Sequence, residues 1–135
     1  MEYLDKKMET WFEKHYNISF VVVLVIAFII FYFSSIPASG YQPGLGILTK
    51  VYHLGIFFLL SLFLIIGLVK GKMKNKQLIF LAATLSICYA ILDETHQLFV
   101  SGRTSSVVDV IIDSIGIFSA GILYSIRINF MPLSD

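Results

Sequence analysis

Ionisable and amide side chains recur in three apolar segments of the sequence, at spacings that place several of them on one helical face. Asp93, His96 and Gln97 stand at i, i+3 and i+4, so they share a face of a helix. Two further pairs have this relation in the neighbouring segments: Lys50 with His53, and Asp109 with Asp113. Such groups can bind a polar ligand, transfer a proton or ligate a metal.

The residue types leave the chemistry open between binding and catalysis. Asp93 or His96 could act as a general base, but the hydroxyl residues nearby are typical of helix ends, and no nucleophile, base and orienting acid stand together. A divalent cation is a weaker alternative, because no dense ligand motif such as HExxH occurs. Its ligands would be His53, Asp93, His96 and Asp113. We therefore expect no resident metal or cofactor, and favour a binding site over an enzyme.

Composition places these segments in a membrane. The chain has 135 residues, of which 57% are hydrophobic and 14% are charged. A soluble domain of this length has about 25% charged residues and could not bury so much apolar surface, so the excess must face lipid. The net charge of +1 gives no support to nucleic acid as a partner. The single cysteine, Cys88, excludes an internal disulfide.

Four apolar stretches are long enough to cross a bilayer, which takes about 20 helical residues. They cover residues 18–33, 47–69, 77–100 and 106–126. Residues 1–17 repeat apolar side chains at helical spacing and predict an amphipathic helix in the membrane interface, with a frayed polar tail as the alternative. The expected fold class is all-α: an integral membrane bundle of four transmembrane helices over residues 18–135, behind a short N-terminal interfacial helix.

The lysines predict the orientation of the bundle. Residues 70–76 hold four lysines and no acid, whereas residues 34–46 hold no charge. By the positive-inside rule the lysine-rich loop is cytoplasmic. Three lysines before the first span and Arg127 after the last agree with this. We expect a multi-pass protein of the cell membrane with both termini in the cytoplasm.

This topology brings polar residues of three spans to one level below the outer face. At 1.5 Å per residue, His53, Asp93 and Asp113 lie about 9–10 Å from the outer ends of their spans. Ionised groups at such depth face the protein interior or a wet cavity. The acids of the fourth span are therefore expected to pair with Lys50 or Arg103 in an outward-opening cleft. Ion pairs that only lock the helices together are the alternative.

The segments 93–103 (DETHQLFVSGR) and 109–116 (DVIIDSIG) together resemble the VanZ-like family. The family pattern reads approximately E-x-x-Q-x-F-x-x-G-R, five residues, then D-V-x-x-(N/D)-x-x-G. It is filled here by Glu94, Gln97, Phe99, Gly102, Arg103, Asp109, Val110, Asp113 and Gly116. Asp93 and His96 accompany this set in one branch of the family, and the member that gave it its name lacks the full set. The resemblance implies a small integral membrane protein of the cell envelope, with one member linked to teicoplanin resistance.

Together these observations favour an envelope protein that binds a lipid headgroup, a lipid-linked precursor or a lipophilic antibiotic, with glycopeptide or lipopeptide tolerance as one implication. Membrane lipids or a lipid-linked envelope component would be its partners. The expected ligand-binding residues are Lys50, His53, Asp93, Glu94, His96, Gln97, Arg103, Asp109 and Asp113. The alternative is a membrane-embedded transferase or hydrolase acting on a phosphate- or acyl-bearing lipid, with Asp93 or His96 as catalytic residue.

Overall fold

The computed structural model describes residues 11–38, 45–70 and 76–129, and all regular structure in these ranges is helical. The helices are α2 (Trp11–Lys14), α3 (Tyr16–Ser34), α4 (Leu45–Val69), α5 (Lys76–Gln97) and α6 (Val107–Asn129). Each of the four long helices is long and apolar enough to cross a membrane. The expected all-α bundle of four transmembrane helices is therefore confirmed.

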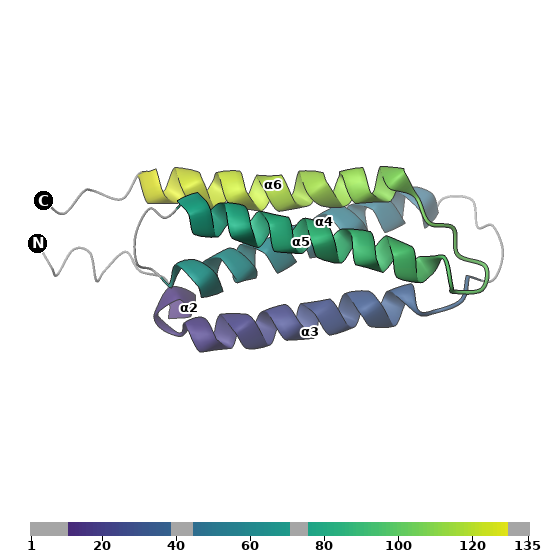
Figure 1. Cartoon of the computed structure of the whole chain (residues 1–135), viewed down its shortest axis with the longest axis horizontal. Helices are drawn as coiled ribbons and strands as arrows, with labels where there is room; N and C mark the ends of the chain where they lie inside the picture. Colours follow the sequence, from purple (N-terminus) through teal and green to yellow (C-terminus); the bar gives the residue numbers. More distant parts are fainter. Residues whose placement is uncertain (1–10, 39–44, 71–75, 130–135) are drawn as a thin grey trace, which may run out of the picture.

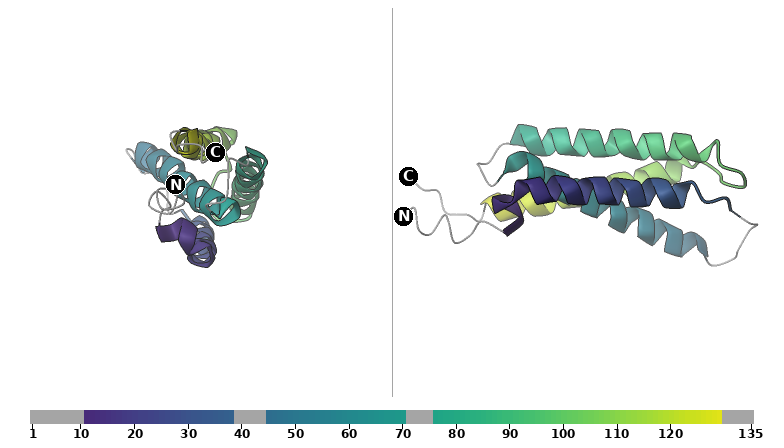
Figure 2. Two further views of the ribbon diagram at one scale, coloured as in Figure 1. Left: turned by 90° about the vertical axis from the view of Figure 1, so that its left-hand side faces the viewer. Right: turned by 90° about the horizontal axis from the view of Figure 1, so that it is seen from below.

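The four long helices run lengthwise through the molecule, with consecutive helices antiparallel and α4 inclined to the others (Figure 1). α4 packs on each of the other three, whereas α3 and α6 do not pack on each other within the described ranges. Viewed along the bundle, α4 crosses between α3 and α6 (Figure 2). The end of α3, the start of α4, the end of α5 and the start of α6 consequently meet at one end of the molecule.

The spans differ from the expected ranges mainly at the end of α5. This helix stops at Gln97 rather than Val100, and the chain turns at residues 98–102. Gly102 has φ +75°, a conformation that favours glycine, and a Cβ there would lie 2.2 Å from the Ala38 carbonyl oxygen. The Ala38 N–H donates to the Ser101 carbonyl at 3.2 Å. The loop after α5 is thus folded closely onto the exit of α3.

The N-terminal interfacial helix expected over residues 1–17 lies largely outside the described residues. Its described part is the four-residue α2, while Tyr16 and Asn17 already belong to α3. Phe12 packs edge-to-face on Phe63 of α4, with ring centroids 5.1 Å apart, and Trp11 is exposed. α2 therefore lies against the bundle with its tryptophan outward.

The bundle interior changes from apolar to polar along its length. One apolar cluster joins α4, α5 and α6 at the end of the bundle near Lys70 and Lys76; it contains Ile65, Ile66, Val69, Ala82, Ala120, Tyr124 and Ile128. A second occupies the middle and contains Ile26, Ile30, Phe57, Leu60, Ala90 and Ile117. Beyond it, the buried positions of the same helices are polar: His53, Asp93, Glu94, Gln97 and Asp113.

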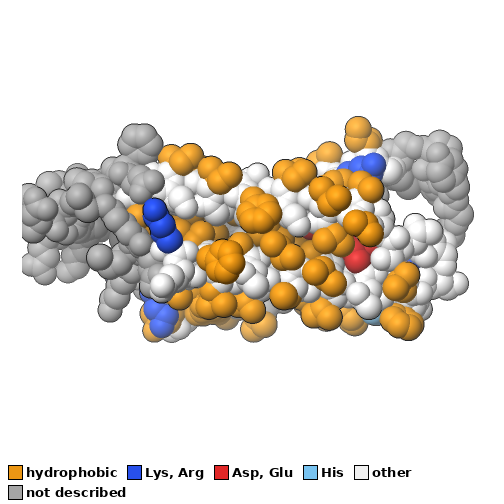
Figure 3. All heavy atoms as spheres, turned by 45° about the horizontal axis from the view of Figure 1, so that its top comes forward, with side chains coloured by type: hydrophobic (Ala, Val, Ile, Leu, Met, Phe, Trp, Pro, Cys, Tyr) orange, Lys and Arg blue, Asp and Glu red, His pale blue; other side chains and the backbone are white. Residues whose placement is uncertain are grey.

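The outer surface suits a lipid environment. Large apolar side chains are exposed along all four spans, among them Leu24, Ile47, Phe80 and Ile122. On the face drawn in Figure 3 the described charged side chains lie toward the two ends, and apolar side chains cover the length between them. The exposed apolar surface is therefore the part that contacts the bilayer core.

Candidate functional site

The helix faces that pack in the apolar core carry polar residues where they reach this end of the bundle. On α5 the buried positions run Ala82, Ser86 and Ala90, and then Asp93, Glu94 and Gln97. Small residues let neighbouring helices approach closely, and the acids that follow on the same side must then face the interior. On α6, Asp113 likewise lies on the buried face, ahead of the buried residues Ile117 and Ala120. The helix faces that form the core thus deliver the acids to the site.

His53 of α4 and Asp113 of α6 form a buried pair at the centre of this end. The imidazole Nδ1 lies 3.1 Å from Asp113 Oδ1, and the residues are 5% and 0% exposed. Gly116, nearly one turn further along α6, allows the close approach of the two helices, since a Cβ there would lie 2.3 Å from the Leu54 carbonyl oxygen. Phe57 stacks on the imidazole from one turn along α4.

Glu94 connects α5 to the start of α6. Its Oε2 accepts a 2.7 Å hydrogen bond from the backbone N–H of Ser106, the residue before α6 begins. The carboxylate therefore caps a free N–H group at a helix N-terminus, where negative charge is favoured. The other oxygen, Oε1, is buried and accepts no hydrogen bond from any described residue, as is also true of Asp113 Oδ2.

Asp93 and Gln97 form a second polar unit, between α5 and α3. Gln97 Nε2 donates to Asp93 Oδ2 at 3.0 Å and to Ser34 Oγ at 3.4 Å. The first bond confirms that these two residues share a face of α5. The second ties the end of α5 to the end of α3. Asp93 is buried and lies within electrostatic range of the His53–Asp113 pair.

His96 turns away from that pair, toward α3. Its Nε2 lies 3.0 Å from Ser35 Oγ, and its ring lies 4.8 Å from the Phe31 ring. The Ser35 hydroxyl also donates to the Phe31 carbonyl at 2.7 Å. This is the side-chain-to-backbone bond that serines commonly make inside helices. No acid among the described side chains orients the His96 imidazole.

The expected ion pairs of the fourth-span acids with Lys50 or Arg103 do not form. Arg103 Nε donates to the Ile36 carbonyl at 3.1 Å, and its Nη2 donates to the Phe33 carbonyl. The Phe33 carbonyl lies in the last turn of α3 and the Ile36 carbonyl just beyond the helix, where carbonyls lack the regular i+4 partner and so attract the guanidinium. Lys50 lies exposed on α4, and Asp113 pairs with His53 instead. Asp109 is half-buried near the start of α6.

A cleft of about 400 Å³ opens between the end of α3 and the start of α4 and reaches the buried histidine. Its lining consists of Phe33, Ser34, Leu48, Thr49, Tyr52, His53 and Arg103. Only His53 and Arg103 of this set were expected from the sequence. Phe33, Leu48 and Tyr52 are apolar or aromatic, like the residues that face lipid, so their types do not distinguish the wall of a cleft from the lipid-facing surface. The position of Tyr52 beside His53 was the available hint.

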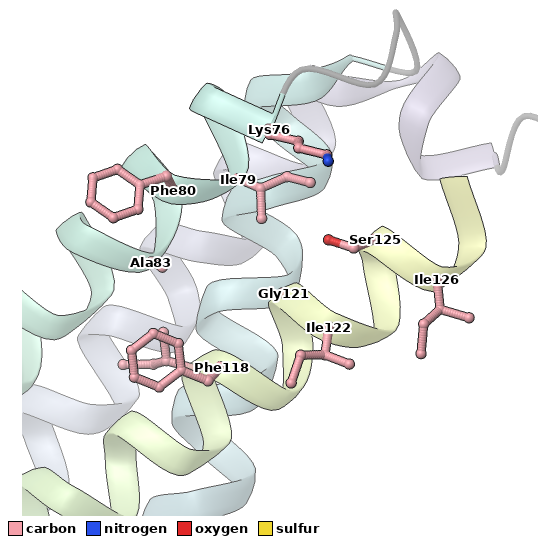
Figure 4. Close-up of a pocket in the computed structure, with 10 residues that line it drawn as sticks. Lys76, Ile79, Phe80, Ala83, Phe118, Gly121, Ile122, Ser125 and Ile126 are labelled. Carbon is pink, nitrogen blue, oxygen red and sulfur yellow. The ribbon is translucent and has the colours of Figure 1, made fainter. Parts of the chain in front are cut away.

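A second hollow of about 380 Å³ lies between α5 and α6, toward the opposite end of the bundle (Figure 4). Its walls are apolar, with Ile79 and Phe80 from α5 facing Phe118 and Ile122 from α6. Lys76 and Ser125 are the polar groups at its rim. It lacks the convergent polar side chains that mark a specific site, so the cleft beside His53 is the stronger candidate.

Comparison with known proteins identifies the family of the chain. A family model described as VanZ/LLP1 matches residues 18–128, which is most of the chain. The chain therefore belongs to the VanZ/LLP1 family, as the motif around Glu94 and Asp109 indicated. No curated protein and no solved structure gives a significant match.

Proposed function

We propose that this member of the VanZ/LLP1 family binds the headgroup of an anionic amphiphile in the cleft between α3 and α4, at the outer face of the cell membrane. A membrane lipid, a lipid-linked envelope precursor and a lipophilic antibiotic share this chemistry. The observation that carries the proposal is the cleft itself, which combines apolar walls with polar groups at the end of a membrane-spanning bundle.

The lining of the cleft supports an amphiphile more than a free polar solute. Phe33 and Leu48 offer apolar contact to an acyl chain, whereas Tyr52 and His53 offer hydrogen bonds. Arg103 contributes positive charge at the same place. Its guanidinium has five N–H donors, and the bonds to the end of α3 use two of them. The remaining donors can meet an anionic headgroup.

The distribution of lysines supports the outward orientation. Lys70 and Lys76 lie at the end of the bundle opposite the cleft, and the Lys70 ammonium lies over the Tyr16 ring at 4.6 Å. Positive charge accumulates on the cytoplasmic side of membrane proteins. The cleft would then open toward the outer leaflet, with both chain termini in the cytoplasm.

The proposal can be tested by filling the cleft without touching its polar groups. Leu48→Trp adds bulk to the lining, and Leu85→Trp adds the same bulk at an exposed position of α5 outside the cleft. Wild-type protein in nanodiscs of mixed phosphatidylglycerol and phosphatidylcholine would be released and analysed by native mass spectrometry. We expect retained phosphatidylglycerol in the wild type and in Leu85→Trp, and a loss of about tenfold in Leu48→Trp, equivalent to about 1.4 kcal/mol.

Equal retention of the two lipids by the wild type, or unchanged retention in Leu48→Trp, would argue against the proposal. The same variants can be compared in a susceptible host exposed to teicoplanin and to a glycopeptide without a lipid chain. Protection against teicoplanin alone, lost in Leu48→Trp, would indicate a lipophilic antibiotic as ligand. If neither variant changes the protection, the cleft does not bind the antibiotic.

A lipid-modifying enzyme is the second candidate, and one contact favours it. Ser35 Oγ lies 3.0 Å from His96 Nε2, the relation of a nucleophile to a general base. The Ser35 hydroxyl also donates to a carbonyl of its own helix, and no described acid orients the imidazole, so binding remains the better-supported function. Conversion of added phospholipid by the wild type, absent in Ser35→Ala, would reverse this preference.

A further inference from the structure

Three buried side chains from three different helices converge behind the cleft. His53 of α4, Glu94 of α5 and Asp113 of α6 each place a nitrogen or oxygen atom so that the three atoms lie within 4.8 Å of one another. The residues are 5%, 3% and 0% exposed. They are contributed by three helices that all pack on one another, so the arrangement is not a property of a loop.

Two oxygen atoms in this set have no partner. Glu94 Oε1 and Asp113 Oδ2 are buried, and no described residue donates a hydrogen bond to either. The partner oxygens are used, Glu94 Oε2 by the Ser106 N–H and Asp113 Oδ1 by His53. Buried polar atoms are nearly always satisfied in folded proteins, so two such oxygens in one cluster indicate a missing partner.

A cation would satisfy both oxygens at once. Two carboxylates and an imidazole are buried together, and an unpaired charge in such surroundings is strongly disfavoured. The two cationic residues expected at this site do not reach the cluster. Arg103 binds the carbonyls at the end of α3, and Lys50 is exposed to the surroundings. The described part of the chain therefore offers the cluster no cationic side chain.

We propose that His53, Glu94 and Asp113 bind a divalent transition-metal ion, Zn²⁺ or Mn²⁺. A dication matches the charge of two carboxylates, and an imidazole ligand favours these metals over Mg²⁺ and Ca²⁺, which prefer oxygen alone. This set differs from the ligands considered from the sequence, because Asp93 and His96 bond to Gln97 and Ser35 instead.

The spacing can accommodate one ion once the side chains rotate toward it. Zn²⁺ bonds to nitrogen and oxygen are about 2.1 Å, so two ligands at tetrahedral angles lie about 3.4 Å apart. The three atoms lie within 4.8 Å of one another, so no pair has to close by more than about 1.4 Å, which rotation of the two carboxylate side chains can supply.

Three protein ligands leave at least one coordination position open, as in metal sites that bind a further molecule. His53 belongs both to this set and to the lining of the cleft, so that position lies near the cleft. Metal binding is nevertheless independent of the proposed amphiphile, because it can be measured on the protein alone. Failure of one proposal leaves the other intact.

The test is metal binding by the full chain, purified through a tag that contains no histidine, stripped with chelator and reloaded with Zn²⁺ or Mn²⁺. Glu94→Gln and Asp113→Asn keep the size of each side chain and the oxygens that accept the Ser106 and His53 bonds. Asp93→Asn is the matched control, a buried acid of α5 outside the set. Elemental analysis and titration calorimetry would give stoichiometry and affinity.

We expect one ion per chain in the wild type and in Asp93→Asn, and binding weakened by about 10–100-fold or more in the other two variants. Added metal should raise the thermal unfolding midpoint of the wild type and not that of Glu94→Gln or Asp113→Asn. If a variant fails to fold, the wild type can be loaded with Co²⁺ instead. The visible spectrum of bound Co²⁺ reports the ligands of the metal without any substitution. No stoichiometric ion in the wild type, or equal affinity in all variants, would overturn the proposal.

Discussion

Glu94 of α5 accepts a hydrogen bond from the backbone N–H of Ser106, so an acid from one transmembrane helix caps the next. Glu94→Gln retains an oxygen that can accept this bond, whereas Glu94→Ala leaves the N–H without a partner. We expect the alanine variant to be less stable than the glutamine variant by about 1–2 kcal/mol, the usual cost of a lost N-cap. Unfolding in mixed micelles, with chelator present to exclude metal effects, measures the difference. Equal stability of the two variants would refute the capping role.

Arg103 should resist replacement by lysine although the charge is kept. The guanidinium bonds two carbonyls at the end of α3, and an ammonium cannot reproduce that planar arrangement. We expect Arg103→Lys to lower the free energy of unfolding by about 1.5–3 kcal/mol, the range for hydrogen bonds that involve a charged group. Lys50→Ala, at an exposed position of α4, is the control and should change it by less than about 0.5 kcal/mol. Full stability of Arg103→Lys would show that only charge matters there.

Gly116 should be intolerant of a single added methyl group. A Cβ at this position would lie 2.3 Å from the Leu54 carbonyl oxygen, which would push α6 away from α4. We expect Gly116→Ala to cost about 1–3 kcal/mol, as overpacking does, and to weaken the His53–Asp113 contact. Gly55→Ala is the matched control, because a Cβ there meets nothing within 4 Å. The thermal midpoints of both variants in detergent would be compared, and a midpoint for Gly116→Ala equal to that of the wild type would contradict the close approach.

The orientation of the bundle can be read from thiol accessibility. Ser105 and Lys76 are exposed at opposite ends of the molecule, so a cysteine at either position in a Cys88→Ser background reports one membrane face. We expect an impermeant thiol reagent to label Ser105→Cys in intact cells and Lys76→Cys only after permeabilisation, because lysine-rich loops remain in the cytoplasm. The reverse pattern would invert the topology and move the cleft to the inner leaflet.

The sequence predicted the elements of this fold well because length and apolarity alone decide whether a segment spans a membrane. It also predicted that His53, Asp93 and Asp113 lie at one end, since depth follows from counting residues along each helix. The end of α5 was misplaced by three residues because Leu98 to Val100 are apolar yet form a turn. That turn depends on the positive φ of Gly102 and its contact with Ala38, neither of which hydropathy reports.

The partners within the site could not be predicted, because they depend on how each helix is rotated and on which helices are neighbours. Asp113 meets His53 since α6 packs on α4, and Arg103 is drawn to the end of α3 by carbonyls that no motif reveals. Glu94 was expected nearer the outer face of the membrane than Asp93, but the residue is only 3% exposed. Its carboxylate turns toward the protein interior and bonds the start of α6. His96 shares a helix with Asp93 but bonds across to Ser35.

During membrane insertion, Asp93 and Glu94 enter the bilayer on α5. An isolated α5 has no neighbouring helix that could keep these two acids away from lipid. An acid near the centre of an isolated span costs roughly 2.5–3.5 kcal/mol on insertion scales, and less near its end, where these two residues lie. α4 is synthesised before α5 and already presents His53, whereas the N–H of Ser106 that bonds Glu94 arrives only with α6. Release of α5 into lipid is therefore least costly once α6 is beside it. The last two helices are expected to leave the translocation channel as a hairpin rather than one at a time.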